Sequence, residues 1–324
     1  MPLRVGAALT ALLGLLVLVA NPLQAQQRWH KDYFPNVELI NQDGKKVRFY
    51  DDVIKGKTVA ISFVYTHCQD VCPLDTAALR RVHQLVGKRM GRDVHFYSIS
   101  IDPENDTPAV LKGYMKTFAI GPGWTFLTGR PQDIALIQRK LGISPVAPGA
   151  LSSHDTRFIL GNEPMARWIK RTPHDDPEVL ANILTRELSS RGMARDTAPV
   201  RSYADVGSIK PISAGGSLFM TRCAACHSIG PGIGRGDGAL GPDLAGVTER
   251  RPHAWLARWI KEPDRMRAEK DPATMALMAR YRNLPMPNLR LSDANAEELI
   301  AYIADESRRL PSAAAPAGHA AHIH

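Results

Sequence analysis

The sequence predicts an α/β domain with a mixed sheet, followed by a small domain built of helices alone. In the first part, two β-rich runs at residues 58–65 and 94–101 alternate with segments of helical periodicity, which is typical of α/β folds. After about residue 213 the strand signals almost disappear, and helical segments are joined by loops rich in glycine and proline. The length of 324 residues also suits two domains.

Each element of the α/β part is predicted from its apolar period, about two residues for a strand and about 3.6 for a helix. The clearest helix start is at Thr107 and Pro108, because threonine caps a helix and proline suits its first position. In chain order we expect a hairpin at 37–40 and 46–49, a strand at 58–65, a helix at 74–90, a strand at 94–101, a helix at 108–118, a strand at 124–129, a helix at 131–141, a closing hairpin at 157–160 and 166–169, and a helix at 177–188.

The helical part is predicted to fold around something other than its own side chains. Its expected helices are short, and they lie at 215–222, 254–261, 273–280 and 293–309. The loops between these helices are too long for a core of this size to stabilise. We therefore expect a bound group to fill the core of the helical domain. We place the α/β domain at 29–190, a linker at 191–212, the helical domain at 213–310, and at 311–324 a disordered tail with His319, His322 and His324.

The N-terminus has the pattern of a secretory signal peptide over residues 1–25. Arg4 precedes an apolar run at 5–20, and the segment ends with the small residue Ala25. A retained membrane anchor is the alternative, although the apolar run is short for spanning a bilayer. In either case we expect exported domains, in the periplasm or at the outer face of the cytoplasmic membrane.

The charge of the chain argues against a nucleic-acid partner. The formal net charge is +9, but the lysines and arginines are scattered and no basic stripe is interleaved with aromatic residues. A scattered positive excess is typical of a solvated surface, and it suits acidic protein partners. We therefore expect protein partners and no nucleic acid.

The four cysteines form two close pairs, Cys68 with Cys72 and Cys223 with Cys226. A secreted scaffold held together by disulfides would use more cysteines, spread along the chain. Each pair therefore indicates a site rather than a structural cross-link.

The second pair belongs to a Cys-x-x-Cys-His motif formed by Cys223, Cys226 and His227, which indicates one covalently attached haem c. Two cysteines three residues apart can form thioethers to the two vinyl groups on one haem edge, and the adjacent histidine then binds the iron. A structural zinc site is the alternative, but no second Cys/His pair lies nearby to complete four ligands. A haem would also fill the core of the helical domain.

The second axial ligand of such a haem is predicted to be Met286. This residue stands between two prolines, in a segment that cannot be helical and that directs the thioether away from the backbone. A His/Met pair is typical of an electron-transfer iron with a raised potential. Three other methionines lie in or near helical stretches and are expected in the core: Met266, Met275 and Met278.

From residue 212 to 310 the chain resembles the class I cytochrome c family. Besides the haem motif, it shares Phe219 before the motif, the run 241–244 after it and the run 299–303 in the last helix. The resemblance implies that the first and last helices pack together, with Phe219 near Tyr302. It also implies that Pro242 lies close to His227.

The first pair, Cys68 and Cys72, lies between a buried strand and a helix, so we expect a helix N-terminus to favour thiolates there. Thiolates serve both metal binding and disulfide exchange, and the spacing allows either. Soft thiolates prefer Cu(I) or zinc, and an imidazole would complete a site for copper in both oxidation states. The sequence offers four candidate imidazoles: His67, His83, His95 and His154.

The α/β part resembles the SCO/SenC family over residues 29–190. The resemblance is carried by Cys68-x-x-x-Cys72-Pro73, by 100–108 (SIDPENDTP), by 124–129 (WTFLTG), and by His154 ahead of a short strand. Members are thioredoxin-fold copper proteins that assist assembly of the CuA centre of cytochrome c oxidase. The resemblance implies that Cys68, Cys72 and His154 bind copper, as Cu(I) and Cu(II). Gln69 stands where members often have proline, which removes no ligand.

We interpret the chain as a copper chaperone, or thiol reductant, for the CuA-bearing oxidase subunit, fused to a monohaem electron-transfer domain. Other redox proteins are further expected partners, and the membrane is one only through a retained N-terminal anchor. The alternative is an enzyme, a haem-coupled thiol-disulfide oxidoreductase that uses Cys68 and Cys72 without metal. A plain electron carrier is the third hypothesis.

Overall fold

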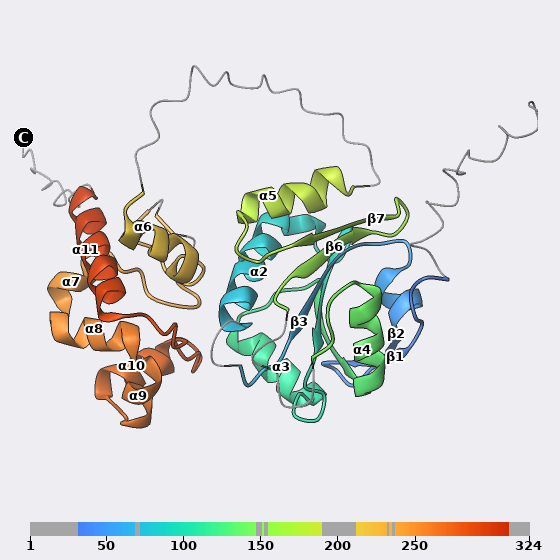
Figure 1. The fold of residues 1–324 in the computed structure, drawn as a ribbon, viewed down its shortest axis with the longest axis horizontal. Coiled ribbons are helices and arrows are strands. Elements are labelled where there is room, and N and C mark those ends of the chain that lie inside the picture. The colour runs from blue at the N-terminus through green and yellow to red at the C-terminus, as the bar shows by residue number, and fades with distance from the viewer. Residues whose placement is uncertain are drawn as a thin grey trace, which may run out of the picture.

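A computed structural model describes residues 32–68, 72–146, 151, 155–189, 212–231, 233–234 and 237–310. Its first part is a mixed sheet of seven strands, in the order β2-β1-β5-β4-β3-β6-β7 (Figure 1). The three central strands run parallel and the outer pairs antiparallel. The strands are β1 (Glu38–Asn41), β2 (Lys46–Arg48), β3 (Thr58–Val64), β4 (Val94–Ser100), β5 (Trp124–Gly129), β6 (Phe158–Asn162) and β7 (Arg167–Arg171).

Helices cover both faces of this sheet, which makes a three-layer α/β domain. On one face, Val82 of α2, Leu111 of α3 and Leu184 after α5 are fully buried against the sheet. On the other face of the sheet, Ile54 of the turn at Phe49–Ile54 and Ile137 of α4 are buried in the same way. The helices are α2 (Cys72–Val86), α3 (Pro108–Thr117), α4 (Pro131–Lys140) and α5 (Pro177–Asn182), with π-helical turns at Phe49–Ile54 and Ile183–Glu187 and a 3₁₀ turn at Gly87–Arg89.

The expected strands and helices of this part are confirmed, with small shifts at their ends. The cap at Thr107 is also confirmed, because its hydroxyl accepts the N–H of Val110 at 3.4 Å and Pro108 opens α3. The π-helical turn at Phe49–Ile54 was not expected, since its six residues are too few to show a helical period. Residue 49, expected at the end of a strand, begins that turn instead.

The second part is helical within the described residues, as expected. Its elements are α6 (Ala214–Leu218), continued by a π-helical turn (Phe219–Cys223), α7 (Val247–Arg250), α8 (His253–Lys261), α9 (Pro263–Ala268), α10 (Pro272–Arg280) and α11 (Asp293–Arg309). The helices α7 and α9 were not expected, and their few residues again explain why. No helix among the described residues is both long and apolar enough to cross a membrane.

The first and last helices of this part cross closely, as the resemblance implied. The rings of Phe219 and Tyr302 are 5.8 Å apart. Gly215 permits the approach, because a Cβ there would lie 2.1 Å from the carbonyl oxygen of Glu298.

The three methionines expected in the core of this part have different surroundings. Met266 is buried, as expected. Met275 is 42% exposed, so the expectation for it is wrong. Met278, one turn further along α10, faces a cavity. The helix α10 therefore presents only one side to the interior, and Met275 lies on the other.

Candidate functional site

The first thiol pair lies where β3 meets α2. Cys68 follows β3, and Cys72 is the first residue of α2. Both thiols are almost completely buried, with exposed fractions of 7% and 2%. The backbone N–H of Cys72 donates to the sulfur of Cys68 at 3.4 Å. The first turn of the helix therefore offers a donor to one of the two sulfurs, as expected for a thiol beside a helix N-terminus.

The pKa of the Cys72 thiol is raised, which corrects the expectation that the helix terminus favours a thiolate at both cysteines. The hydrogen bond with Cys68 is the larger cause and burial is the second. Two negative sulfurs in contact away from water would repel each other, so the metal-free pair keeps a proton on Cys72. A bound cation would remove this cost, because a coordinating thiol loses its proton.

Asp75, one turn into α2, is a second group that burial holds neutral. Burial and the charge of Cys68 raise the pKa of this carboxyl from 3.8 to about 8. Its Oδ1 accepts no hydrogen bond from the described residues, and Nε2 of His174 lies 3.7 Å away. Burial and the nearby Arg222 lower the pKa of His174, so that imidazole is neutral at neutral pH. At neutral pH, the carboxyl of Asp75 is therefore protonated, and it lies near Cys68.

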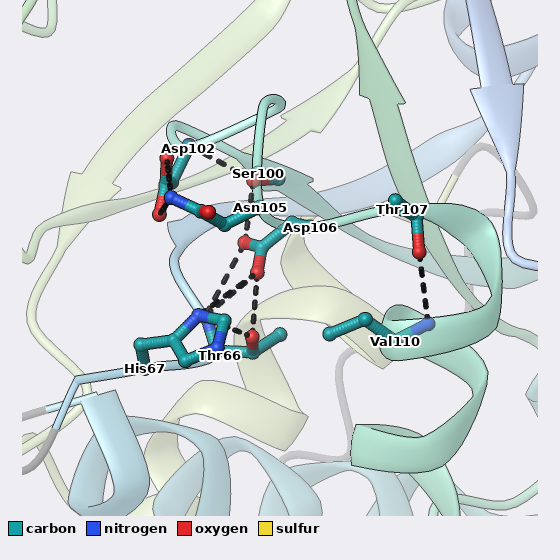
Figure 2. Close-up of polar contacts among 8 residues, drawn as sticks. All are labelled: Thr66, His67, Ser100, Asp102, Asn105, Asp106, Thr107 and Val110. Atoms are coloured by element: carbon teal, nitrogen blue, oxygen red, sulfur yellow. Dashed lines mark hydrogen bonds and ion pairs between the residues drawn. The ribbon is translucent and has the colours of Figure 1, made fainter.

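A buried carboxylate, Asp106, fixes the chain just before the thiol pair (Figure 2). It is fully buried, and it accepts the N–H of Thr66 at 3.2 Å and the hydroxyl of Thr66 at 2.5 Å. It also accepts the hydroxyl of Ser100, at the end of β4, at 2.6 Å. Thr66 is two residues before Cys68, so Asp106 ties the cysteine loop to the loop that follows β4.

Sequence reasoning used Asp106 only as part of a motif and missed this role. The signal was present, however: an aspartate that follows a buried strand and directly precedes a helix cap lies where polar groups converge at a sheet edge. The structure shows that it serves the loop and not the helix. The cap itself is Thr107.

The histidines proposed as metal ligands have different surroundings. His67 is adjacent to Cys68 and mostly exposed, with Nδ1 3.3 Å from the Thr66 hydroxyl and 3.9 Å from Asp106 (Figure 2). His83 is hydrogen-bonded to the carbonyl of Pro122 at 2.8 Å, and burial lowers its pKa. His95 is stacked on Tyr97. His83 and His95 thus have the surroundings of ordinary structural residues in a helix and a strand.

His154, the expected third copper ligand, lies outside the described residues. Within residues 32–68, 72–146, 151, 155–189, 212–231, 233–234 and 237–310, no three His, Cys, Asp or Glu side chains gather as a metal site. The described part of the candidate copper site is therefore the pair Cys68 and Cys72.

The second thiol pair faces an apolar cavity of about 250 Å³ in the helical part. Four predicted haem-binding residues line it together: Cys223, Cys226, His227 and Met286. Burial raises the pKa of each thiol to about 12, so both are neutral thiols, the form that adds to vinyl groups. The expectation that a bound group completes this core agrees with the presence of the cavity.

His227 is oriented for a metal. Its Nδ1 lies 2.9 Å from the carbonyl oxygen of Pro242, the proximity that the resemblance implied. A carbonyl can only accept, so Nδ1 carries the hydrogen and Nε2 keeps its lone pair. Burial also lowers the pKa of His227, and the neutral imidazole is the form that binds iron.

The thioether expected on the opposite side is available from two methionines. Met286 lies in an extended segment without helix or strand, as its flanking prolines predicted, and Met278 lines the same cavity from α10. Arg250 and Arg251 also line it, and their charges suit the carboxylates of a haem. Two thiols, an oriented imidazole, a thioether and apolar walls together fit a haem c.

Comparison with known proteins divides the chain in the same way. Residues 25–189 match the SCO1/SenC family model, and residues 212–306 match the cytochrome c model. A SCO1 protein homolog of Bacillus subtilis is 37% identical over 146 residues, which cover 42% of this chain and 74% of that protein. A putative copper-binding protein of Stutzerimonas stutzeri is 27% identical over 121 residues, 37% of this chain and 57% of that protein.

Among solved structures, ScoI of Bradyrhizobium japonicum with copper bound is similar to this chain. It is 31% identical, and the match covers 45% of this chain and 94% of that one with a TM-score of 0.39.

Replacing Asp106 by alanine should loosen the cysteine loop, because two partly buried donors of Thr66 and the buried hydroxyl of Ser100 lose their acceptor. We expect the free energy of unfolding of the α/β part to fall by about 2–4 kcal/mol in urea titrations. Alkylation of Cys68 should accelerate at least about tenfold, since the loop opens more often. Asp102→Ala is the control, because the carboxylate of Asp102 in the same loop accepts a hydrogen bond from Asn105 alone among the described residues, and it should change stability by less than about 0.5 kcal/mol. Equal effects of the two variants would contradict the role of Asp106.

Asp75 should make stability fall as pH rises, because its folded pKa of about 8 lies above the unfolded value of 3.8. Below the unfolded pKa both states are protonated and the carboxyl costs nothing. Between the two values the unfolded state gains from ionisation while the folded state does not. Asp75→Asn should therefore stabilise the metal-free protein more at about pH 8 than at about pH 5, measured by urea unfolding. A gain that does not change with pH would contradict this account.

Proposed function

This chain belongs to the SCO1/SenC family, and we propose that its α/β part binds copper and assists assembly of the CuA centre of cytochrome c oxidase. The observation that carries the proposal is the pair of buried thiols, Cys68 and Cys72, where β3 meets α2. Family members are copper-binding proteins involved in assembly of the oxidase. The proposed partner is the oxidase subunit that bears CuA.

Copper is the cargo in this proposal. Cys68 and Cys72 hold Cu(I) as thiolates, since soft ligands select the soft ion. His154 joins them for Cu(II), which prefers an added imidazole. Binding releases the proton that Cys72 keeps in the metal-free pair, so a copper ion and a proton exchange places. Delivery then proceeds by ligand exchange with the cysteines of the target.

The helical part is a cytochrome c domain, and we propose that it carries one haem c. Cys223 and Cys226 would hold the haem by thioethers, and His227 and Met286 would bind its iron. When bound, such a group supplies one-electron chemistry. The contribution of the chain is to fix His227 through Pro242 and to exclude water with the apolar cavity.

Both parts are proposed to work after export. The basis is the signal-like pattern of residues 1–25, which lie outside the described residues. CuA assembly takes place where exported domains are found, at the outer face of the cytoplasmic membrane. Whether the segment is removed or retained as an anchor does not alter the site.

A second candidate function, a thiol-disulfide oxidoreductase, is favoured by the hydrogen bond between the two thiols. In that function Cys68, which accepts the helix N–H, attacks a disulfide, and Cys72 resolves the mixed disulfide. The two hypotheses differ in their need for His154. Exchange activity in metal-free protein that His154→Ala leaves unchanged would favour the oxidoreductase.

Copper titration of the full chain tests the proposal directly. Wild-type protein should bind one copper, and Cu(II) should show thiolate charge-transfer bands and nitrogen hyperfine coupling in electron paramagnetic resonance. His154→Ala should lower Cu(II) affinity at least about a hundredfold, because loss of even an outer partner of a metal ligand costs 10- to 100-fold. Cu(I) affinity, measured against a competing chelator, should change much less.

Two variants make the titration specific. Cys72→Ser should abolish tight binding of both oxidation states. His95→Gln is the matched control, because His95 is stacked on Tyr97 in β4, and it should bind copper as the wild type does. Weak binding that is indifferent to His154 and to Cys72 would exclude the copper function.

The axial methionine can be tested in the same holoprotein. Met286→Ala should remove the sulfur-to-iron absorption band of the ferric haem and lower the midpoint potential by on the order of 0.1 V, since a thioether ligand raises it. Met278 lines the same cavity, so Met278→Ala is the control, and this variant should retain the absorption band. Loss of the band in Met278→Ala instead would assign the iron to the other methionine.

A further inference from the structure

One face of α2 contacts the helical part of the chain. Figure 1 shows α2 on the side of the α/β part that faces the helical part. Three of its residues share that face because they are spaced three and four apart: Ala77, Arg80 and Gln84. The opposite face is packed on the sheet through Leu79, Val82 and Val86.

The contact has an apolar centre. Ala77 and Phe118 of the α/β part form one buried cluster with Leu240 of the helical part. Cys226, one of the two cysteines proposed to hold the haem, packs against the same cluster. The edge of the haem cavity at Cys226 therefore lies against the α/β part rather than in water.

Beside this centre lies a charged anchor. Arg80 and Asp237 form an ion pair at 2.8 Å, and Gln84 donates to the same carboxylate at 2.7 Å. Nε of Arg80 also donates to the carbonyl of Ala119 at 3.3 Å, so its guanidinium is fixed from both parts of the chain. The Arg80 side chain is only 11% exposed and that of Asp237 32% exposed, so the pair is largely shielded from water.

The electrostatics of the anchor agree with a specific contact. Burial alone would raise the pKa of Asp237, but the hydrogen bonds from Arg80 and Gln84 outweigh it and lower the pKa to about 2. Burial is the main influence on the Cys226 thiol, and the charge of Arg80 is the next, acting to lower its pKa. The charge of Arg80 on α2 thus reaches Cys226, one of the cysteines proposed to hold the haem, across the contact.

The same helix begins at the other site. Cys72 is its first residue, and Ala77 is five residues further on, or about 7.5 Å along the helix axis. The candidate copper site and the edge of the haem cavity are therefore joined by less than two turns of one helix. No mobile segment intervenes along this path through α2.

We propose that α2 is the docking surface for the haem-binding part, and that Arg80 and Asp237 are positioning residues that hold the Cys226 edge against the helix that carries Cys72. This inference rests on the proposed function of both sites and adds how they are coupled. It gives the haem a redox partner within the same chain. A single electron would pass, reducing Cu(II) to Cu(I) while the iron goes from ferrous to ferric, with no bond made or broken.

Charge reversal on α2 tests the docking. In the full chain with haem attached and no copper, Arg80→Glu should raise backbone hydrogen exchange at residues 77–84 and 237–240 at least about tenfold, because a shielded pair becomes a repulsion. The double variant Arg80→Glu with Asp237→Arg restores an opposite-charge pair and should recover most of the protection. Lys55→Glu makes the same change of charge at an exposed residue beside the π-helical turn, on the other face of the sheet from α2, and should leave exchange at the wild-type level.

A second measurement connects docking to function. With Cu(II) bound and the haem reduced by a flash-generated one-electron donor, the rate of haem oxidation should be independent of protein concentration in the wild type. Arg80→Glu should slow it at least about tenfold, and the charge-swapped pair should recover it. Lys55→Glu should react at the wild-type rate.

The outcomes separate this inference from the proposed function. If Arg80→Glu changes neither the exchange nor the rate while copper still binds through Cys68, Cys72 and His154, the docking is wrong and the copper function stands. If Arg80→Glu opens the contact and the swap closes it, yet the wild type binds no copper, the docking stands and the copper function is wrong. Failure of the swapped pair to recover protection would also overturn the roles of Arg80 and Asp237.

Discussion

The buried carboxylate of Asp106 is the interaction on which the thiol site depends. Thr66 lies in an irregular segment between the end of β3 and Cys68, and such a segment would otherwise sample many conformations. Asp106 removes that freedom by accepting from Thr66 twice and from Ser100 once. Because Ser100 ends β4 and Thr66 follows β3, the loop inherits the rigidity of two paired core strands. The sulfurs are therefore positioned by the sheet.

The helix α2 contacts three different parts of the structure. Its first turn meets the thiol pair, its apolar face is buried on the sheet, and its outer face meets the haem-binding part. A helix with a period of 3.6 residues can separate such roles by face and by position along its axis. Cys72 and the Ala77 surface that packs near Cys226 belong to the same helix, so α2 is an element common to both sites.

Much of this arrangement could be predicted from the sequence, where the signal is local. The strands β3 and β4 follow from apolar runs and the start of α3 from Thr107, while the contact of Pro242 with His227 was implied by the resemblance to the cytochrome c family. The raised pKa of Cys72 could not be predicted in this way, since it arises from burial and from the proximity of two sulfurs. The pairing of Gln84 and Asp237 could not either, since 153 residues separate them and no periodicity connects distant partners.

Three of the four cysteines share a property that connects the fold to its proposed chemistry: burial favours the protonated form of Cys72, Cys223 and Cys226. At Cys223 and Cys226 burial raises the pKa to about 12, and at Cys72 the hydrogen bond with Cys68 adds to burial. A neutral thiol can be buried at little cost, whereas an unpaired thiolate cannot, so the protonated form suits these positions before either site is loaded. In the proposed function, copper would replace the proton of Cys72, and carbon–sulfur bonds would replace those of Cys223 and Cys226. The same burial that stabilises the empty sites thus excludes water from the filled ones.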